Sequence, residues 1–200
     1  IARWPLLGTL VARTGTLFAC EQAGVSPDFL CLSKGLTGGY LPLSAVLTGE
    51  RVYAAFYDEY SKLNAFLHSH SYTGNPLACA AARATLAIFR AEPVLERNRG
   101  LARLMRASVA ALEDHPHVAE IRQQGMILAI ELVKDRATRE PWDFRERRGL
   151  AVYHAALERS VLLRPIGNVV YFMPPYVITP EEIALLGRVA FESIEAATCG

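Results

Sequence analysis

The sequence predicts an α/β fold in which the end of one sheet domain is followed by a smaller α+β domain. Three observations predict it. Residues 29–32 form a short, continuous apolar run, which is typical of a strand buried on both faces in a parallel sheet. Residues 77–91 are rich in alanine and predict a helix. Beyond residue 115, short apolar runs alternate with helix-like segments, as in a compact α+β unit.

The composition indicates an ordinary globular protein with enough chain for a core. Of its 200 residues, 52% are hydrophobic and 20% charged, and the net charge of +1 favours neither nucleic acid nor an anionic membrane as a partner. The four cysteines show no CxxC pair and no histidine at metal-ligand spacing, so we expect no metal site and a reducing compartment. No apolar run could span a bilayer and no signal-peptide pattern is present, so a cytoplasmic location is expected.

The first part of the chain predicts a second strand and a short helix beside the strand over residues 29–32. The second strand is expected over residues 43–48, and the short helix within residues 50–60. Residues 61–75 are polar and aromatic, and we expect a loop there.

Two long helices are expected next. Asn75 and Pro76 supply an N-cap and a proline at the first helical position, which predicts the start of the helix over residues 77–91. Apolar residues recur at helical spacing through residues 94–113, which predicts a second, amphipathic helix. The later elements expected are strands over 126–132, 161–163 and 169–173, a helix over 143–160, and a last helix from Thr179 to about Ala197.

Lys34 stands where chemistry is expected. Ligand sites in open α/β sheets lie just beyond the carboxyl ends of the strands, and Lys34 follows the run over residues 29–32. A lysine that emerges from apolar surroundings would be desolvated, which favours the neutral, nucleophilic amine. Gly35, Gly38 and Gly39 would let the backbone pass close to a bound cofactor. The alternative is a solvated loop lysine that merely follows a strand.

The segment over residues 68–76 is a second candidate site. Its hydroxyl groups and backbone donors crowd the positive end of an expected helix, which is a natural place for a phosphate. Alternatively, the same side chains could simply cap the helix. The two histidines in the segment have no evident third partner for a metal, so a structural or loop role is expected for them.

Arg164 is the third candidate, because it lies in an otherwise apolar β segment. An arginine there is costly unless it meets an anion, and its planar fork suits a carboxylate. The alternative is a salt bridge to a nearby glutamate.

Together the three segments resemble the class III, fold-type-I pyridoxal-phosphate-dependent aminotransferases. Residues 28–43, DFLCLSKGLTGGYLPL, resemble the family's cofactor-lysine region, and residues 71–80, SYTGNPLACA, resemble its phosphate-contacting loop. In residues 164–176 an Arg-Pro pair precedes a tyrosine and the run Met-Pro-Pro-Tyr. That order resembles the biotin-pathway branch rather than ornithine or GABA aminotransferases. The resemblance runs from about Arg13 to the C-terminus.

The resemblance implies roles at the cofactor. Lys34 would bind pyridoxal 5′-phosphate covalently and then move a proton between the substrate carbon and the cofactor carbon. Ser71 and the backbone of His70 would contact the cofactor phosphate of the partner subunit, because active sites of the family lie at a homodimer interface. The family more often has threonine and proline at these two positions, so the hydroxyl group is kept here.

The resemblance also implies substrates and the residues that bind them. The reaction would transfer the amino group of S-adenosylmethionine to 8-amino-7-oxononanoate, giving 7,8-diaminononanoate for biotin synthesis. Lys34 and Ser69 would contact the substrate, and Arg164 would clamp the acceptor's carboxylate. Tyr171 would line the same pocket, and Arg13 would line its entrance.

Three domain segments follow from the resemblance. Residues 1–92 would be the C-terminal part of the large pyridoxal-phosphate-binding domain, residues 93–114 a connecting helix, and residues 115–200 the small α+β domain. Residues 1–12 are atypical, because the family's Asp-Glu pair, whose aspartate keeps the cofactor ring nitrogen protonated, is not found there. The family's Gly-Ser phosphate cup is not found either, so we expect a fragment with little or no activity. Another class III ω-amino-acid aminotransferase and a non-catalytic dimerising remnant are the alternatives.

Overall fold

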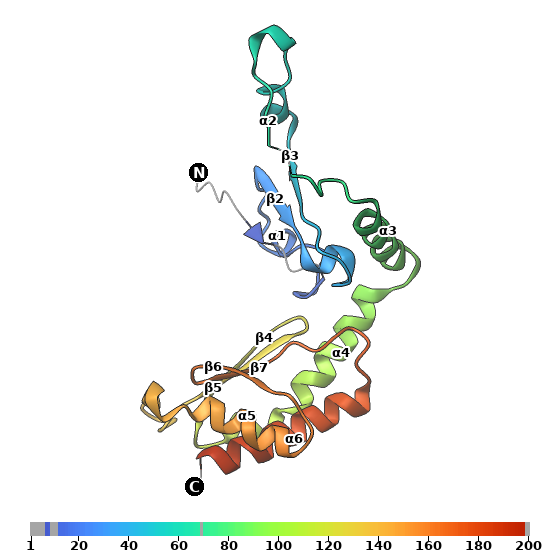
Figure 1. Cartoon of the computed structure of the whole chain (residues 1–200). Helices are drawn as coiled ribbons and strands as arrows, with labels where there is room; N and C mark the ends of the chain where they lie inside the picture. Colours follow the sequence, from blue (N-terminus) through green and yellow to red (C-terminus); the bar gives the residue numbers. More distant parts are fainter. Residues whose placement is uncertain (1–6, 9–11, 69, 199–200) are drawn as a thin grey trace. The chain divides into compact units, whose positions relative to one another are not determined.

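The computed structural model describes residues 7–8, 12–68 and 70–198. The chain divides into two compact units, residues 1–94 and residues 95–200 (Figure 1). Each unit has its own sheet, and each is described by itself below. In the part of the chain that the structure describes, no helix has the length and apolar character needed to cross a membrane.

The sheet of the first unit has three short strands. They are β1 (Leu7–Gly8), β2 (Phe29–Leu32) and β3 (Ala45–Thr48), with β2 in the centre. The strand expected over residues 29–32 is confirmed, but its expected setting is only partly right. β1 runs parallel to β2, whereas β3 runs antiparallel to it. Only Leu32 of β2 is buried, because a sheet of three short strands leaves the faces of its central strand partly open.

Helical segments flank this sheet in the chain. The first unit contains α1 (Ala19–Gln22), η1 (Lys34–Thr37), α2 (Glu50–Ala54), η2 (Tyr60–Lys62) and α3 (Pro76–Ala91). The Ala-rich helix is confirmed in α3, which begins after Asn75 with Pro76 at its first position. Ala78 and Ala82, one turn apart, are its buried residues, and α3 packs against η1. The short helix expected within residues 50–60 ends already at Ala54.

The second unit contains a four-stranded antiparallel sheet in the order β4-β5-β7-β6. Its strands are β4 (Val118–Gln124), β5 (Ile127–Leu132), β6 (Arg164–Ile166) and β7 (Val169–Phe172). The helices α4 (Val94–Ser108), α5 (Arg148–Glu158) and α6 (Pro180–Thr198) lie on one side of this sheet (Figure 1). Burial alternates along β5 and β7, so one face of the sheet meets the helices.

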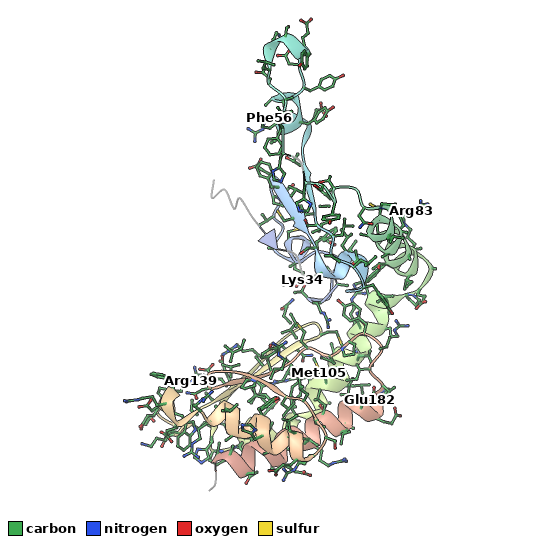
Figure 2. The ribbon with its side chains drawn as sticks, in the orientation of Figure 1. Lys34, Phe56, Arg83, Met105, Arg139 and Glu182 are labelled. Atoms are coloured by element: carbon green, nitrogen blue, oxygen red, sulfur yellow. The ribbon has the colours of Figure 1, made fainter. Side chains whose placement is uncertain are left out.

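One hydrophobic core joins these layers of the second unit. Each large apolar side chain that is fully buried contributes about 1.5–3 kcal/mol relative to exposure. The largest of them, contributed by the sheet, the helices and their connections, are Met105, Leu112, Met126, Leu128, Ile130, Leu132, Leu163, Ile183 and Ile194. Figure 2 shows Met105 on α4, where it is completely buried.

The start of α6 follows the capping pattern expected from the sequence. The backbone N–H of Thr179 donates to the Glu182 carboxylate at 2.8 Å, and the N–H of Glu182 donates to the Thr179 hydroxyl at 3.2 Å. This reciprocal pair satisfies two donors that the first turn of a helix otherwise leaves open. Figure 2 labels Glu182 at this end of the helix.

Other elements of the second unit differ from the expectation. β4 was not predicted, because its polar sequence VAEIRQQ belongs to an edge strand that buries little of itself. The strand expected over residues 161–163 is wrong: Val161 and Leu163 are buried, but the hydrogen-bonded strand begins at Arg164.

Two of the three helices expected around this sheet are shorter than predicted. α4 ends at Ser108 and is followed by the separate turn η3 (Ala110–Asp114). α5 begins only at Arg148, because η4 (Phe144–Glu146) takes up the first residues expected for it.

His115 is buried where η3 meets β4, with 4% of its surface exposed. Its Nδ1 accepts the backbone N–H of His117 at 3.1 Å, and its Nε2 lies 2.9 Å from Oε1 of Glu195 on α6. The accepting Nδ1 therefore carries no proton, and protonating it would break the bond to His117. Burial lowers the pKa of His115 below its ordinary 6.5, although the Glu195 carboxylate acts in the opposite direction.

We expect His115 to make the protein less stable in acid. A histidine whose pKa is lower in the folded state contributes its full stability above the unfolded value, and loses it as the pH falls below that value. Chemical denaturation of the wild type and of His115→Gln, between about pH 8 and about pH 5, should show the smaller acid loss in the variant. His154→Gln, on the exposed surface of α5, is the control. An equal acid loss in wild type and His115→Gln would contradict the assignment.

Candidate functional site

Lys34 begins the turn η1 at the carboxyl end of the central strand β2 (Figure 2). The backbone changes direction abruptly there: Ser33 is extended, with φ −161°, and Lys34 has φ +52°. A side chain in this left-handed region costs about 1 kcal/mol or more, so the turn must be held by its surroundings.

A buried hydroxyl group and two glycines hold this turn. The Thr37 side chain, 1% exposed, donates to the carbonyl of Leu41 at 2.6 Å. Gly38 and Gly39 have positive φ angles, and their N–H groups donate to the carbonyls of Gly35 and Lys34 at 3.1 and 3.3 Å. The turn therefore needs the glycines that follow Lys34 for backbone conformation, besides any approach of a cofactor.

Helix α3 supports the turn from one side. A β-carbon placed at Gly38 would lie 3.4 Å from the Thr85 hydroxyl of α3. This contact, together with the small buried residues Ala78 and Ala82, shows that the helix approaches the turn closely.

The Lys34 amine is exposed and makes no ion pair or hydrogen bond among the described residues. The chain's other two lysines are both paired: Lys62 with Asp58 at 2.8 Å, and Lys134 with Glu140 at 3.0 Å. The expectation that apolar surroundings desolvate Lys34 is wrong for this chain, because Ser33 and Gly35 beside it are exposed as well. What distinguishes Lys34 here is a free amine on a fixed turn.

In the loop before α3, one polar side chain caps the helix and another does not. The Asn75 side chain accepts the N–H groups of Leu77 and Ala78 at 3.0 and 3.4 Å, so it caps the helix. Ser71 has no part in the cap: its exposed hydroxyl makes no hydrogen bond among the described residues. Capping therefore accounts for Asn75 and leaves Ser71 available for a ligand.

The other residues predicted in this loop have mixed outcomes. The carbonyl of His70 accepts the N–H of Thr73 at 2.8 Å, and its Nδ1 accepts the N–H of Tyr72 at 3.2 Å, so His70 shapes the turn. Ser69 lies outside the described residues. The contact of Ser71 and the His70 backbone with a cofactor phosphate of the partner subunit stays a prediction.

Arg13 lies half-buried in the turn before α1. Around it the N–H of Ala12 donates to the carbonyl of Leu17 at 2.9 Å, and the Gln22 amide donates to the carbonyl of Thr14 at 2.6 Å. The Arg-Thr-Gly turn is thus well bonded, while the role of Arg13 at a site entrance stays a prediction.

In the second unit, Arg164 and Tyr171 lie opposite each other on β6 and β7. The guanidinium carbon of Arg164 lies 5.8 Å from the centre of the Tyr171 ring. No carboxylate pairs with Arg164 among the described residues, so the salt bridge to a glutamate is not observed. The charge of this exposed arginine remains available to an anionic ligand.

A small cavity of about 130 Å³ adjoins this pair. Apart from Arg164 and Tyr171 its wall is almost entirely apolar, and the other residues that line it are Leu162, Leu163, Phe172, Met173, Pro174 and Leu186. A carboxylate on an aliphatic chain fits this combination of one cation and an apolar wall.

The sequence reasoning missed an apolar groove in the first unit. It has a volume of about 690 Å³ and runs between β3, α2 and the loop after η2, close to Phe56 (Figure 2). The residues that line it are Phe29, Val46, Thr48, Val52, Tyr53, Phe56, Tyr57, Ala65 and Phe66. Exposed apolar and aromatic surface is typical of places where a protein meets another surface. The concentration of aromatic residues between 53 and 72 was the signal that could have revealed it.

Comparison with known proteins identifies the family. Residues 8–196 match the family described as "Aminotransferase class-III". The chain is 45% identical over 188 residues to an adenosylmethionine-8-amino-7-oxononanoate aminotransferase of Geobacter sulfurreducens, covering 94% of this chain and 42% of that protein. It is 41% identical to the enzyme of the same name from Methanocaldococcus jannaschii over 195 residues, covering 96% of this chain and 42% of that protein.

Solved structures agree with these relatives. The crystal structure of the Methanocaldococcus jannaschii enzyme superposes with a TM-score of 0.87 at 41% identity, over 92% of this chain and 43% of that one. An omega transaminase from Pseudomonas jessenii in complex with PMP gives a TM-score of 0.88 at 31% identity, over 94% of this chain and 42% of that one. The chain thus spans about two fifths of the length of the relatives it matches.

We expect Asn75 to stabilise the protein and Thr73 to be neutral. Asn75→Ala removes the acceptor of two helical N–H groups and should lower the free energy of unfolding by about 1 kcal/mol, while Asn75→Asp should keep most of it. Thr73→Ala, in the same exposed turn, should change it by less than about 0.5 kcal/mol. Urea denaturation measures all three variants. An equal loss of unfolding free energy in Asn75→Ala and Thr73→Ala would disprove that Asn75, and not Thr73, caps the helix.

Proposed function

The chain belongs to the class-III aminotransferases, and from this we propose that it carries the lysine-bearing portion of a pyridoxal-phosphate-dependent enzyme of biotin synthesis. The proposed reaction transfers the amino group of S-adenosylmethionine to 8-amino-7-oxononanoate and gives 7,8-diaminononanoate. The names of the most similar relatives support these substrates. The observation that carries the proposal is the unpaired Lys34 amine, held on a fixed turn at the end of β2.

The residues of the first unit fit pyridoxal phosphate in part. Lys34 offers an amine with no competing partner among the described residues, and Ser71 offers a hydroxyl group that the helix cap does not use. When bound, this cofactor supplies an electron-withdrawing ring that stabilises charge at the substrate carbon. The fit is incomplete at the ring nitrogen, because the chain has no acidic residue before Glu21.

Lys34 would act twice in the proposed reaction. Its amine would hold the cofactor. Its Nζ would also accept and return a proton at the reacting carbon of the substrate, which requires the amine to stay close to that carbon. A side chain anchored on η1, whose backbone is fixed by Thr37 and two glycines, satisfies that requirement.

Arg164 would bind the acceptor through its carboxylate. Two parallel N–H donors of a guanidinium match the two oxygens of a carboxylate, which fixes orientation as well as charge. Tyr171 beside it, and the apolar wall of the adjoining cavity, suit the aliphatic chain of 8-amino-7-oxononanoate. Ser69 and Arg13 remain proposed substrate contacts from the family resemblance alone.

A homodimer is proposed for the active assembly. The apolar groove of the first unit, with aromatic side chains open to solvent, supports a partner surface there. Ser71 and the backbone of His70 would then reach the phosphate of the partner subunit. In the same proposal, residues 1–92 belong to a large domain, residues 93–114 form a connecting helix, and residues 115–200 form a small domain.

A second candidate is a class III aminotransferase with an ω-amino donor. The similarity to the omega transaminase from Pseudomonas jessenii, with a TM-score of 0.88, supports this second candidate. Incubation with 8-amino-7-oxononanoate and either S-adenosylmethionine or a series of ω-amino acids separates the two. Faster product formation with an ω-amino acid would favour the second candidate, and a chain that binds no cofactor would favour a non-catalytic remnant.

We expect pyridoxal phosphate to attach to Lys34. After incubation of the 200-residue chain with the cofactor and reduction with borohydride, peptide mass spectrometry should find the label on Lys34. Lys62→Arg and Lys134→Arg should leave the labelling unchanged, whereas Lys34→Arg should abolish it at that peptide. Labelling spread evenly over the three lysines would overturn the assignment. Without a carboxylate for the ring nitrogen, turnover should be low even in the labelled chain.

A further inference from the structure

The hairpin that carries Arg164 is held at its turn by hydrogen bonds and by close packing on α5. Gly167 begins its two-residue turn with φ +58°, as a type II′ turn requires. The Asn168 amide donates to the carbonyl of Trp142 at 2.8 Å, and the carbonyl of Asn168 accepts the N–H of Leu132 at 2.8 Å. A β-carbon at Gly149 would lie 2.2 Å from the Gly167 carbonyl oxygen, so α5 lies directly against the turn. The backbone beneath Arg164 has little freedom, but its long side chain has much.

The Tyr171 ring is the neighbour that can restrict that side chain. It lies directly across the strand pair, 5.8 Å from the guanidinium carbon, and is half-buried while Arg164 is exposed. Several arginines of this unit are instead held by acids, such as Arg145 by Asp143 at 2.7 Å and Arg159 by Glu192 at 3.0 Å. An acid would neutralise the cation, whereas a ring orients it and leaves its charge free.

We propose that Tyr171 is a positioning residue whose ring holds the Arg164 guanidinium at the mouth of the adjoining cavity, ready for a carboxylate. The contact reduces the rotamer entropy that Arg164 would otherwise lose when a ligand binds. The ring acts through its face, and the phenolic hydroxyl has no part in it. That the carboxylate belongs to the amino acceptor rests on the proposed function.

The cavity indicates the class of ligand that this pair receives. Its volume of about 130 Å³ is well below the roughly 300 Å³ at which pockets enclose a whole small ligand. It fits the carboxylate end of an unbranched aliphatic chain, with methylene groups against Leu162, Met173 and Leu186. Nonanoate is therefore a suitable probe, because it has such an end and no amino group.

The first test needs no ligand. Heteronuclear NMR relaxation of the Arg164 Nε–H group, in the 200-residue chain, should show a restricted side chain in wild type and in Tyr171→Phe. In Tyr171→Leu and Tyr171→Ile the same group should become mobile, while circular dichroism confirms that the fold is kept. Phe144→Leu, which replaces an exposed ring of the same unit, is the control and should change nothing. Equal mobility of Arg164 in wild type and in both aliphatic variants would overturn the proposal.

The second test measures binding of nonanoate by the same variants. Loss of the ring should weaken binding about two- to fivefold, Tyr171→Phe should bind as wild type does, and Arg164→Gln should bind least. Weakening by Tyr171→Phe equal to that by Tyr171→Leu would assign the role to the hydroxyl group and overturn the proposal. If nonanoate fails to bind wild type while Arg164 mobility still depends on the ring, the acceptor site fails and the positioning role stands.

Discussion

The hydrogen bond of the buried Thr37 hydroxyl is the interaction on which the proposed role of the first unit depends. By donating to the Leu41 carbonyl, it ties the end of the turn η1 to the segment that follows, while the N–H of Gly39 reaches back to the carbonyl of Lys34. Together these bonds hold the turn in which Lys34 has a left-handed conformation. Helix α3 can approach this turn because its buried residues are small alanines and Gly38 has no side chain. A lysine placed in this way keeps its amine free while its backbone is fixed.

In the second unit an arginine is likewise presented on a well-packed backbone. Gly149 lets α5 lie against the β6–β7 turn, so the hairpin that carries Arg164 packs closely on this helix. An aromatic ring, rather than an acid, then lies beside the cation. Among the described residues, Lys34 and Arg164 thus each present a cation with no acidic partner, and the proposed function assigns these two groups to the cofactor and to the acceptor's carboxylate.

The sequence predicted the elements whose pattern is local. The helix after Asn75 and the capped start of α6 follow from side chains within one turn of each other. β4 was missed because an edge strand needs no apolar alternation. Lys34 and Arg164 were singled out from the sequence, and Tyr171 was expected in the same pocket as Arg164. The sequence could not predict that Lys34 is exposed or that Arg164 and Tyr171 lie opposite each other on β6 and β7, because burial and strand register depend on residues far away in the chain.

The central claim is that Lys34 is the lysine whose amine has no partner among the described residues, and cofactor-free competition labelling tests it most directly. A limiting amount of a small acylating reagent at neutral pH should modify Lys34 several times faster than Lys134. The Glu140 hydrogen bond raises the pKa of Lys134 and holds its amine in the protonated form. Lys62, paired with Asp58, should also react more slowly. Modification of Lys34 at or below the rate of the two paired lysines would contradict the account.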